Sequence, residues 1–386
     1  MSFLPEWVPN LHPLVLHFPI ALLFVAAALD AGGLVSGDRG SWRKSANWLY
    51  AVGAVAAVGT WYTGTLAADS VFLPTEANAL LTEHADLGLW TAWFFGGYGV
   101  IRTGLSFTKL AAGLFPRIGL MVIGIGGLVL MSITATHGAE LVYRYGVGVE
   151  AVETRPSEPL ITTAAGDDGM ATSATGWMWM PARAAAWKNS ALWVEGSAES
   201  LHSSLVDGGE RGDVFQFEVT EPTLFVMPGS IDRLQVDLSI DLTGFEGTAL
   251  IAHHVQEDGA YGFTSLGNGQ IRLGKTENSD LLVQATEAMS ETGWQDVRVV
   301  VDGTHYRSYV NTRLAIHGHG AAFAPGLVGL RLNGTGTVRL ASMQAVDLAV
   351  AAGGAMEMSD EEAVLEEVAP EAAEHEHEPE PEKQDQ

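Results

Sequence analysis

The chain has 386 residues, enough for two domains of the usual size of roughly 100 to 200 residues each. Only 17% of the residues are charged and 47% are hydrophobic, yet the formal net charge is −26, so charged and apolar residues must be segregated along the chain. The absence of cysteine excludes disulfides, thiolate metal sites and cysteine-based catalysis. An acidic chain without a basic patch also excludes nucleic-acid binding, which depends on neutralising phosphates with Lys and Arg.

Four apolar runs are long enough to cross a hydrocarbon core of about 30 Å, which takes about 20 helical residues. They could instead form the buried helical core of a soluble protein. However, the runs are apolar on all sides, rich in glycine, and flanked by Trp and Tyr, as membrane-spanning helices are. We therefore predict a four-helix transmembrane bundle within residues 1–149, embedded in a lipid bilayer. The runs cover residues 11–35, 48–67, 87–107 and 118–141.

The basic residues predict the orientation of the bundle, because short cytoplasmic loops carry an excess of Lys and Arg. Such residues lie between the first and second runs and between the third and fourth, whereas the loop between the second and third runs is acidic. Both termini are therefore expected outside the cytoplasm, with everything after Tyr143. The basic residues are Arg39, Arg43, Lys44, Arg102, Lys109 and Arg117; the acidic ones are Asp69, Glu76, Glu83 and Asp86.

Four histidines of the predicted bundle are expected at its extracytoplasmic end. His12 and His17 lie at the start of the first helix, His84 at the start of the third, and His137 at the end of the fourth. An ionisable residue in a membrane helix is costly and suggests a function. Imidazoles from several helices of a bundle hold haem iron or other metals, so the cluster predicts a haem b site, with zinc or copper(II) as alternatives. A purely structural role, with bonds to headgroups and water, stays open.

Three carboxylates lie close to these histidines in the sequence: Glu83, Asp86 and Glu140. A carboxylate that accepts the second ring N–H of a ligating histidine fixes its tautomer and raises its basicity. We expect the three to do this for the bundle histidines.

The helical part resembles a domain-of-unknown-function family of bacterial four-helix membrane proteins. The resemblance rests on residues 11–22, which contain His17-Phe18-Pro19, and on the histidine-bearing stretches 82–88 and 136–149. It implies the four-helix fold and marks the four histidines. Together with the orientation predicted from the basic residues, it leads us to expect a protein of the bacterial inner membrane with both termini periplasmic. Such proteins look like haem-associated or redox-associated membrane components.

The second part of the chain has a different pattern. Residues 150–176 are rich in small and acidic residues, with two prolines and no sustained period, which predicts a linker. Residues 177–349 contain short alternating runs separated by Gly and Asp turns, and Asp302-Gly303 is a strong hairpin signal. We predict an all-β sandwich or jelly roll. Residues 350–386 are expected to form a disordered acidic tail.

The sandwich sequence is similar to the concanavalin and laminin-G type of domain. The similarity rests on Trp294–Gly303, Tyr309-Val310-Asn311 and Gly326–Leu330, and Thr312 stands where that pattern often has glycine. It implies binding or cutting of glycans, or docking of a protein.

Catalysis by the sandwich is not expected. A retaining glycosidase holds two carboxylates about 5 to 5.5 Å apart, which on one strand requires acids two residues apart, and Asp237 and Asp241 are four apart. The pairs His253-His254 and His317-Gly318-His319 have spacings suited to a metal, although strand histidines are more often surface residues.

The sequence thus leads to three functional hypotheses. In the first, a membrane-anchored redox-associated protein binds haem b, and its sandwich or acidic tail docks a periplasmic cytochrome or another redox protein. In the second, a non-catalytic envelope or assembly subunit binds a glycan or a protein through the sandwich. In the third, the bundle histidines hold zinc or copper in place of haem.

Overall fold

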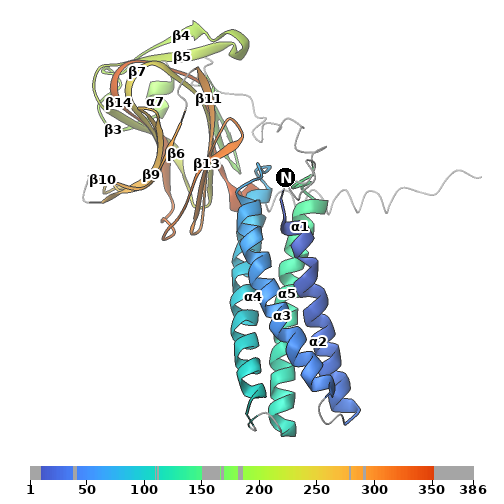
Figure 1. Cartoon of the computed structure of the whole chain (residues 1–386). Coiled ribbons are helices and arrows are strands. Elements are labelled where there is room, and N and C mark those ends of the chain that lie inside the picture. Colours follow the sequence, from blue (N-terminus) through green and yellow to red (C-terminus); the bar gives the residue numbers. More distant parts are fainter. Residues whose placement is uncertain are drawn as a thin grey trace, which may run out of the picture.

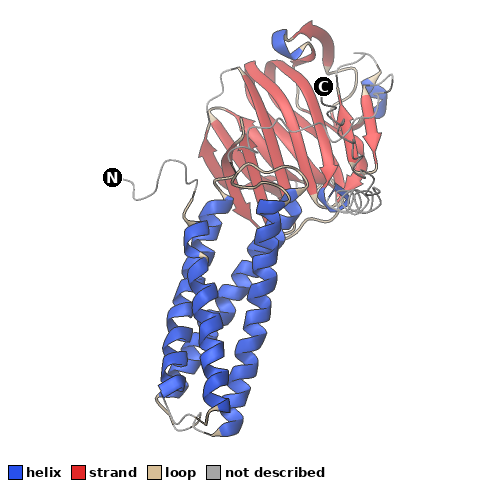
Figure 2. Cartoon of the chain, turned by 90° about the vertical axis from the view of Figure 1, so that its right-hand side faces the viewer, coloured by secondary structure: helices blue, strands red, loops and turns tan. Residues whose placement is uncertain are grey.

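The computed structural model describes residues 10–37, 41–108, 110, 113–149, 166, 169–180, 186–277, 280–289 and 293–351. It consists of a helix bundle and a large β-domain (Figure 1). The β-domain lies at the end of the bundle where α1 begins and α5 ends (Figures 1 and 2).

The bundle follows the predicted runs closely. Its first helix is interrupted at Leu16, because Pro19 cannot donate a backbone hydrogen bond to the Val15 carbonyl one turn earlier. The helices are α1 (His12–Val15), α2 (His17–Val35), α3 (Ser41–Ala68), α4 (Ala77–Ser106) and α5 (Leu114–Tyr143).

Three of the predicted spans are long and apolar enough to cross a membrane: His12–Val35, Ser41–Ala68 and Leu114–Tyr143. The predicted third span, α4, is as long as α5, but its Trp, Gly and Arg residues lower its mean hydropathy. Its outward side chains are nevertheless apolar, and Val100 is 75% exposed. The helical part is therefore a membrane domain in which all four long helices present apolar side chains outward.

Arg102 is not a loop residue, contrary to its use in the orientation argument. It lies in α4, is 4% exposed, and its Nη2 is 2.7 Å from Asp30 Oδ1 of α2. It also donates to Asn47 Oδ1 (2.8 Å) and to the hydroxyl of Tyr98 (2.7 Å). A charge in an apolar environment is tolerated when it is paired and hydrogen-bonded. Arg102 therefore connects helices of the bundle, and it cannot be counted as a basic loop residue in predicting the orientation.

The β-domain is a sandwich of antiparallel strands, as predicted. Its bounds are β1 (Met170–Ser173), β2 (Gly176–Trp179), β3 (Leu192–Glu195), β4 (His202–Asp207), β5 (Asp213–Val219), β6 (Thr223–Ile231), β7 (Leu234–Val255), β8 (Gly262–Gly267), β9 (Gln270–Glu277), β10 (Asp280–Ala288), β11 (Trp294–Asp302), β12 (His305–Val310), β13 (Arg313–His319) and β14 (Gly326–Asp347), with a short helix α7 (Trp187–Ser190).

Two strands of 22 residues, β7 and β14, pair with each other and pass from one layer to the other. The second half of β7 and the first half of β14 lie in one layer, whose strand order is β3-β6-β14-β7-β8-β9-β10. The first half of β7 and the second half of β14 lie in the other layer, which contains the order β5-β14-β7-β11-β12-β13. The turn between layers falls at glycines. Gly336 has φ +117°, and a Cβ there would stand 2.2 Å from the Gly244 carbonyl oxygen.

The sandwich core lies between the two layers and is rich in aromatic side chains. Trp179 packs on Trp187 and Phe215, with ring centroids 4.9 and 5.0 Å apart. These side chains are almost fully buried. Strand β1, inside the stretch predicted as a linker, pairs with β2, so the sandwich begins by Met170. The predicted tail lies outside the described residues, except for its first two.

One face of the sandwich packs directly on the membrane domain. Arg298 donates to the Leu73 carbonyl (2.7 Å) and its guanidinium lies 4.3 Å from the ring centroid of Phe72, both in the loop between α3 and α4. Asn78 donates to Gln235 Oε1 (3.0 Å) at the start of α4. The sandwich is therefore held against the bundle and is not only tethered to it.

Candidate histidine sites where the helices meet the sandwich

His12 and His84 come together at the sandwich end of the bundle. Their ring centroids are 6.3 Å apart, with an interplanar angle of 80°. Each ring lies against a glycine of a neighbouring helix, because a Cβ on Gly64 would be 3.1 Å from His12 Cε1 and one on Gly138 would be 2.9 Å from His84 Cε1. Some bundle glycines thus make room for imidazoles.

The hydrogen bonds of these rings determine which nitrogen is available. His12 Nδ1 lies 3.1 Å from the Thr60 carbonyl oxygen, and His84 Nδ1 lies 3.0 Å from that of Thr134. A carbonyl oxygen only accepts, so each Nδ1 carries the proton and each Nε2 keeps its lone pair. Within the described residues neither Nε2 has a hydrogen-bond partner, which is the state in which imidazole binds a metal.

The other two predicted histidines differ. His137 is half-buried, its Nδ1 lies 2.9 Å from the Ile133 carbonyl, and its Nε2 is 3.8 Å from Glu83 Oε2. His17 is exposed, and among the described residues no ring contact joins it to the other three. The structure thus brings His12 and His84 into contact, leaves His137 beside Glu83, and separates His17 from them.

Two of the three carboxylates do not act as predicted. Asp86 accepts from His305 of the sandwich (3.2 Å), because two helical residues amount to a rotation of about 200° and Asp86 faces away from His84. Glu140 binds Arg144 one turn along the same helix (2.9 Å). Backbone carbonyls take their place as acceptors for the bundle histidines.

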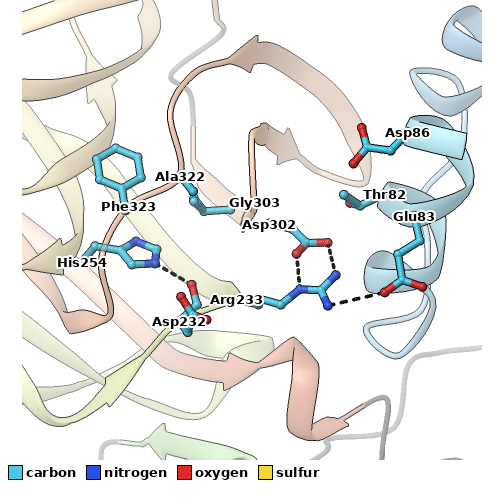
Figure 3. A pocket seen from close by; sticks show the side chains of 11 residues that line it. Thr82, Glu83, Asp86, Asp232, Arg233, His254, Asp302, Gly303, Ala322 and Phe323 are labelled. Atoms are coloured by element: carbon cyan, nitrogen blue, oxygen red, sulfur yellow. Dashed lines mark hydrogen bonds and ion pairs between the residues drawn. The ribbon is translucent and has the colours of Figure 1, made fainter. Parts of the chain in front are cut away.

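A cleft of about 360 Å³ separates the start of α4 from the sandwich (Figure 3). On the sandwich side of the cleft, Arg233 Nε lies 2.5 Å from Asp302 Oδ1, and across the cleft its Nη1 lies 3.7 Å from Glu83 Oε1. The hydrogen bonds that Arg233 donates to the Asp302 carboxylate raise the pKa of Arg233, so the guanidinium stays charged. The lining residues are Thr82, Glu83, Asp86, Asp232, Arg233, His254, Val301, Asp302, Gly303, Ala322 and Phe323.

His253 and His254 are core residues of the sandwich. Their Nδ1 atoms are 2.9 Å apart, so one donates to the other, and His254 Nε2 lies 2.8 Å from the Asp232 carbonyl oxygen. Burial lowers the pKa of His253 well below its usual value, which keeps this ring neutral. Because the two rings bind each other, they do not converge on an ion.

His305 is a residue that the sequence patterns did not single out. The register of β12 and β13 places it directly opposite His319, and His317 lies two residues before His319 on β13. The hairpin turn at Asn311 and Thr312, with φ of +50° and +65°, pairs Val310 with Arg313. A β-bulge at Ala315 then shifts the register by one residue, which places His305 opposite His319. Without the bulge, the same turn would pair His305 with Gly318, so recognising this second hairpin in the sequence would not by itself have brought the three histidines together.

The fold and these residues define a membrane-anchored protein in which one histidine pair of the helix bundle and one group of three histidines of the β-sandwich lie where the two parts meet. Residues 8–151 match the family described as "Predicted membrane protein (DUF2231)". The helical part of the chain is thus similar to this family of membrane proteins. Among curated proteins, no relative matches the chain.

Several solved structures resemble the sandwich. The carbohydrate-binding module CBM66 from Bacillus subtilis is 15% identical, with a TM-score of 0.33, over 40% of this chain and 94% of its own. A B. subtilis protein of unknown function with a galectin-like fold is 10% identical, with a TM-score of 0.36, over 46% and 98%. The Caenorhabditis elegans galectin LEC-6 is 13% identical, with a TM-score of 0.27, over 34% and 94%. Likenesses at this level say nothing about a ligand.

Proposed function

We propose that this protein is a membrane-anchored, redox-associated protein that binds haem b, or alternatively a zinc or copper ion, through His12 and His84. The sandwich then lies on the periplasmic side of a bacterial inner membrane, and both termini face the same way. His137 stands beside the pair, and His17 is not a ligand.

The observation that carries this proposal is the pairing of two pre-oriented imidazoles. Two rings that bind one metal through Nε2, with metal–nitrogen bonds of about 2 Å, have centroids about 5 to 6 Å apart. The observed separation of 6.3 Å lies close to this value, and both rings offer Nε2. Two imidazoles suit haem iron, zinc and copper(II).

In this function, neighbouring residues of the protein fix the tautomers and the positions of the two histidine side chains that bind the metal or haem. The carbonyls of Thr60 and Thr134 hold the ring tautomers, and Gly64 and Gly138 leave the space in which the rings pack. A haem iron bound there would exchange single electrons. The acidic stretch after residue 357 would attract a basic periplasmic redox partner by electrostatic steering.

Purification of the full chain in a mild detergent tests the proposal. We expect a Soret band, or zinc or copper by elemental analysis, that is lost in His12→Ala and His84→Ala. His17→Ala is the matched control, because it removes an exposed histidine from the same end of the bundle, and it should keep the ligand. A colourless protein without bundle-dependent metal would refute the proposal, as would equal loss in the control.

A second candidate function is recognition of a small polar ligand, such as a glycan, in the junction cleft. It is favoured by the cleft's volume of about 360 Å³, which is in the range of small-molecule sites. Ala322→Trp should fill the cleft and weaken binding on a glycan array at least 10-fold, whereas Ala198→Trp, on another loop of the sandwich, should not. Absence of binding by the unaltered protein would eliminate this candidate.

A further inference from the structure

Three histidines of the sandwich gather on one face of the β12–β13 hairpin. His305 and His319 are direct cross-strand partners, and His317 lies two residues from His319, so all three side chains point the same way. Ligand atoms of the three rings lie within 4.8 Å of one another. Nitrogens that share a tetrahedral zinc ion are about 3.4 Å apart, so small side-chain adjustments bring the triad into coordinating distance.

Carboxylates of the membrane domain orient two of these rings. Asp86 Oδ1 of α4 lies 3.2 Å from His305 Nε2, and Asp69 Oδ1, immediately after α3, lies 2.8 Å from His317 Nδ1. Asp86 accepts the ring proton of His305, which leaves the lone pair on Nδ1 of that ring, whereas Asp69 is an ion-pair partner of His317. Within the part of the chain that the structure describes, His305 Nδ1 and His317 Nε2 are buried and have no hydrogen-bond partner. This carboxylate–histidine arrangement is the one that supports metal ligands.

The fixed charges around the triad favour a cation. Asp69 and Asp86 contribute two negative charges, and Arg307, opposite His317 on the same face, contributes one positive charge. Arg307 is 1% exposed, and its Nε and Nη1 have no hydrogen-bond partner among the described residues. An anionic oxygen ligand on a bound metal would satisfy these donors.

The donor set selects the class of metal. Imidazole nitrogens bind zinc, copper(II), nickel and iron, whereas calcium and magnesium prefer oxygen ligands. Three protein ligands leave a fourth position open for water or an exogenous ligand. His319 is exposed, so this position is reached from solvent.

We propose that His305, His317 and His319 form a second site, separate from the bundle pair, that binds a zinc-type divalent transition-metal ion. Asp69 and Asp86 are its positioning residues. Because they belong to the membrane domain, metal binding at this site also strengthens the docking of the sandwich on the bundle.

The test uses the full chain in detergent, without a polyhistidine tag, in a His12→Ala/His84→Ala background that removes the bundle pair. Titration with zinc chloride by calorimetry should give one equivalent of bound zinc. His319→Ala should weaken it at least 10-fold, and His317→Ala/His319→Ala should abolish it. His202→Ala, an exposed strand histidine elsewhere, is the control and should bind like the background.

His319 is exposed and has no hydrogen bond among the described residues, so its removal leaves the fold intact, as circular dichroism will verify. Zinc binding that is absent from the background protein, or that survives in His317→Ala/His319→Ala, overturns the site. Because the bundle pair is absent from every sample, failure here leaves the proposed function standing.

The role of the carboxylates has its own readout. Asp69→Asn and Asp86→Asn should each raise the zinc Kd about 10-fold to 100-fold, the usual effect of removing such a partner. In addition, zinc should slow hydrogen exchange in residues 69–78 of the unaltered chain but not in His317→Ala/His319→Ala. An unchanged zinc Kd in both Asn variants overturns the positioning role, even if they destabilise the junction.

Discussion

Replacing Arg102 with methionine is expected to destabilise the helix bundle by about 3–5 kcal/mol. The guanidinium is buried against Asp30 and donates to Asn47 and Tyr98, and it lies 4.4 Å from the ring centroid of Tyr50. Its removal leaves the Asp30 carboxylate unpaired in an apolar environment. Thermal unfolding of the helices in detergent, followed by circular dichroism, measures the loss.

The double variant Asp30→Leu/Arg102→Met separates the ion pair from simple packing. Replacing a buried pair by apolar side chains of similar volume is often neutral, so most of the lost stability should return. If Arg102→Met alone unfolds at the temperature of the unaltered protein, the pair does not hold the helices together.

Replacing Arg298 with alanine is expected to loosen the sandwich from the membrane domain by about 3 kcal/mol. Arg298 is 8% exposed, donates to the Leu73 carbonyl, and pairs with Asp237 (2.6 Å). Without it, a buried carbonyl and a carboxylate lose their shared donor. Hydrogen exchange of residues 69–78 should accelerate roughly 100-fold, since each 1.4 kcal/mol changes a local opening equilibrium about tenfold.

Arg272→Ala is the matched control for this experiment. Arg272 binds only Gln270 within its own strand among the described residues, so its removal should leave exchange in the loop unchanged. Equal acceleration in both variants would mean that the loop responds to sandwich stability in general and not to the docking contact.

The main features of the fold were predictable because they depend on local pattern. The apolar runs predicted the helices, Pro19 predicted the bend near His17, and Asp302-Gly303 predicted the β11–β12 hairpin, which the register confirms. The length of β7 and β14 was not predicted. The alternating runs in the sequence cover residues 234–240, 248–253, 326–332 and 337–343, so each long strand was expected as two short ones. The glycines at which the strands change layer look like turns in the sequence.

The site was predictable only in part, since its contacts are not local. The equal depth of His12 and His84 followed from helix polarity, and their proximity bears this out. The partner of Asp86 is His305, 219 residues away, and no periodicity reveals such a pairing. Asp30 of α2 and Arg102 of α4 are likewise brought together only by the assembly of the whole bundle, because the two helices pack mainly on α3 and α5.

The position of β14 has a consequence for biosynthesis. This strand pairs with β2, β5, β6 and β7, so the sandwich has no complete core until residue 347 has been synthesised. At 5 to 20 residues per second, translation from Tyr143 to that point takes roughly 10 to 40 seconds. Throughout this interval the inserted helices display Asp69 and Asp86 without their partners, and the unfinished sandwich has open strand edges that invite aggregation. Maturation should therefore depend on a chaperone that shields unpaired β-strand edges.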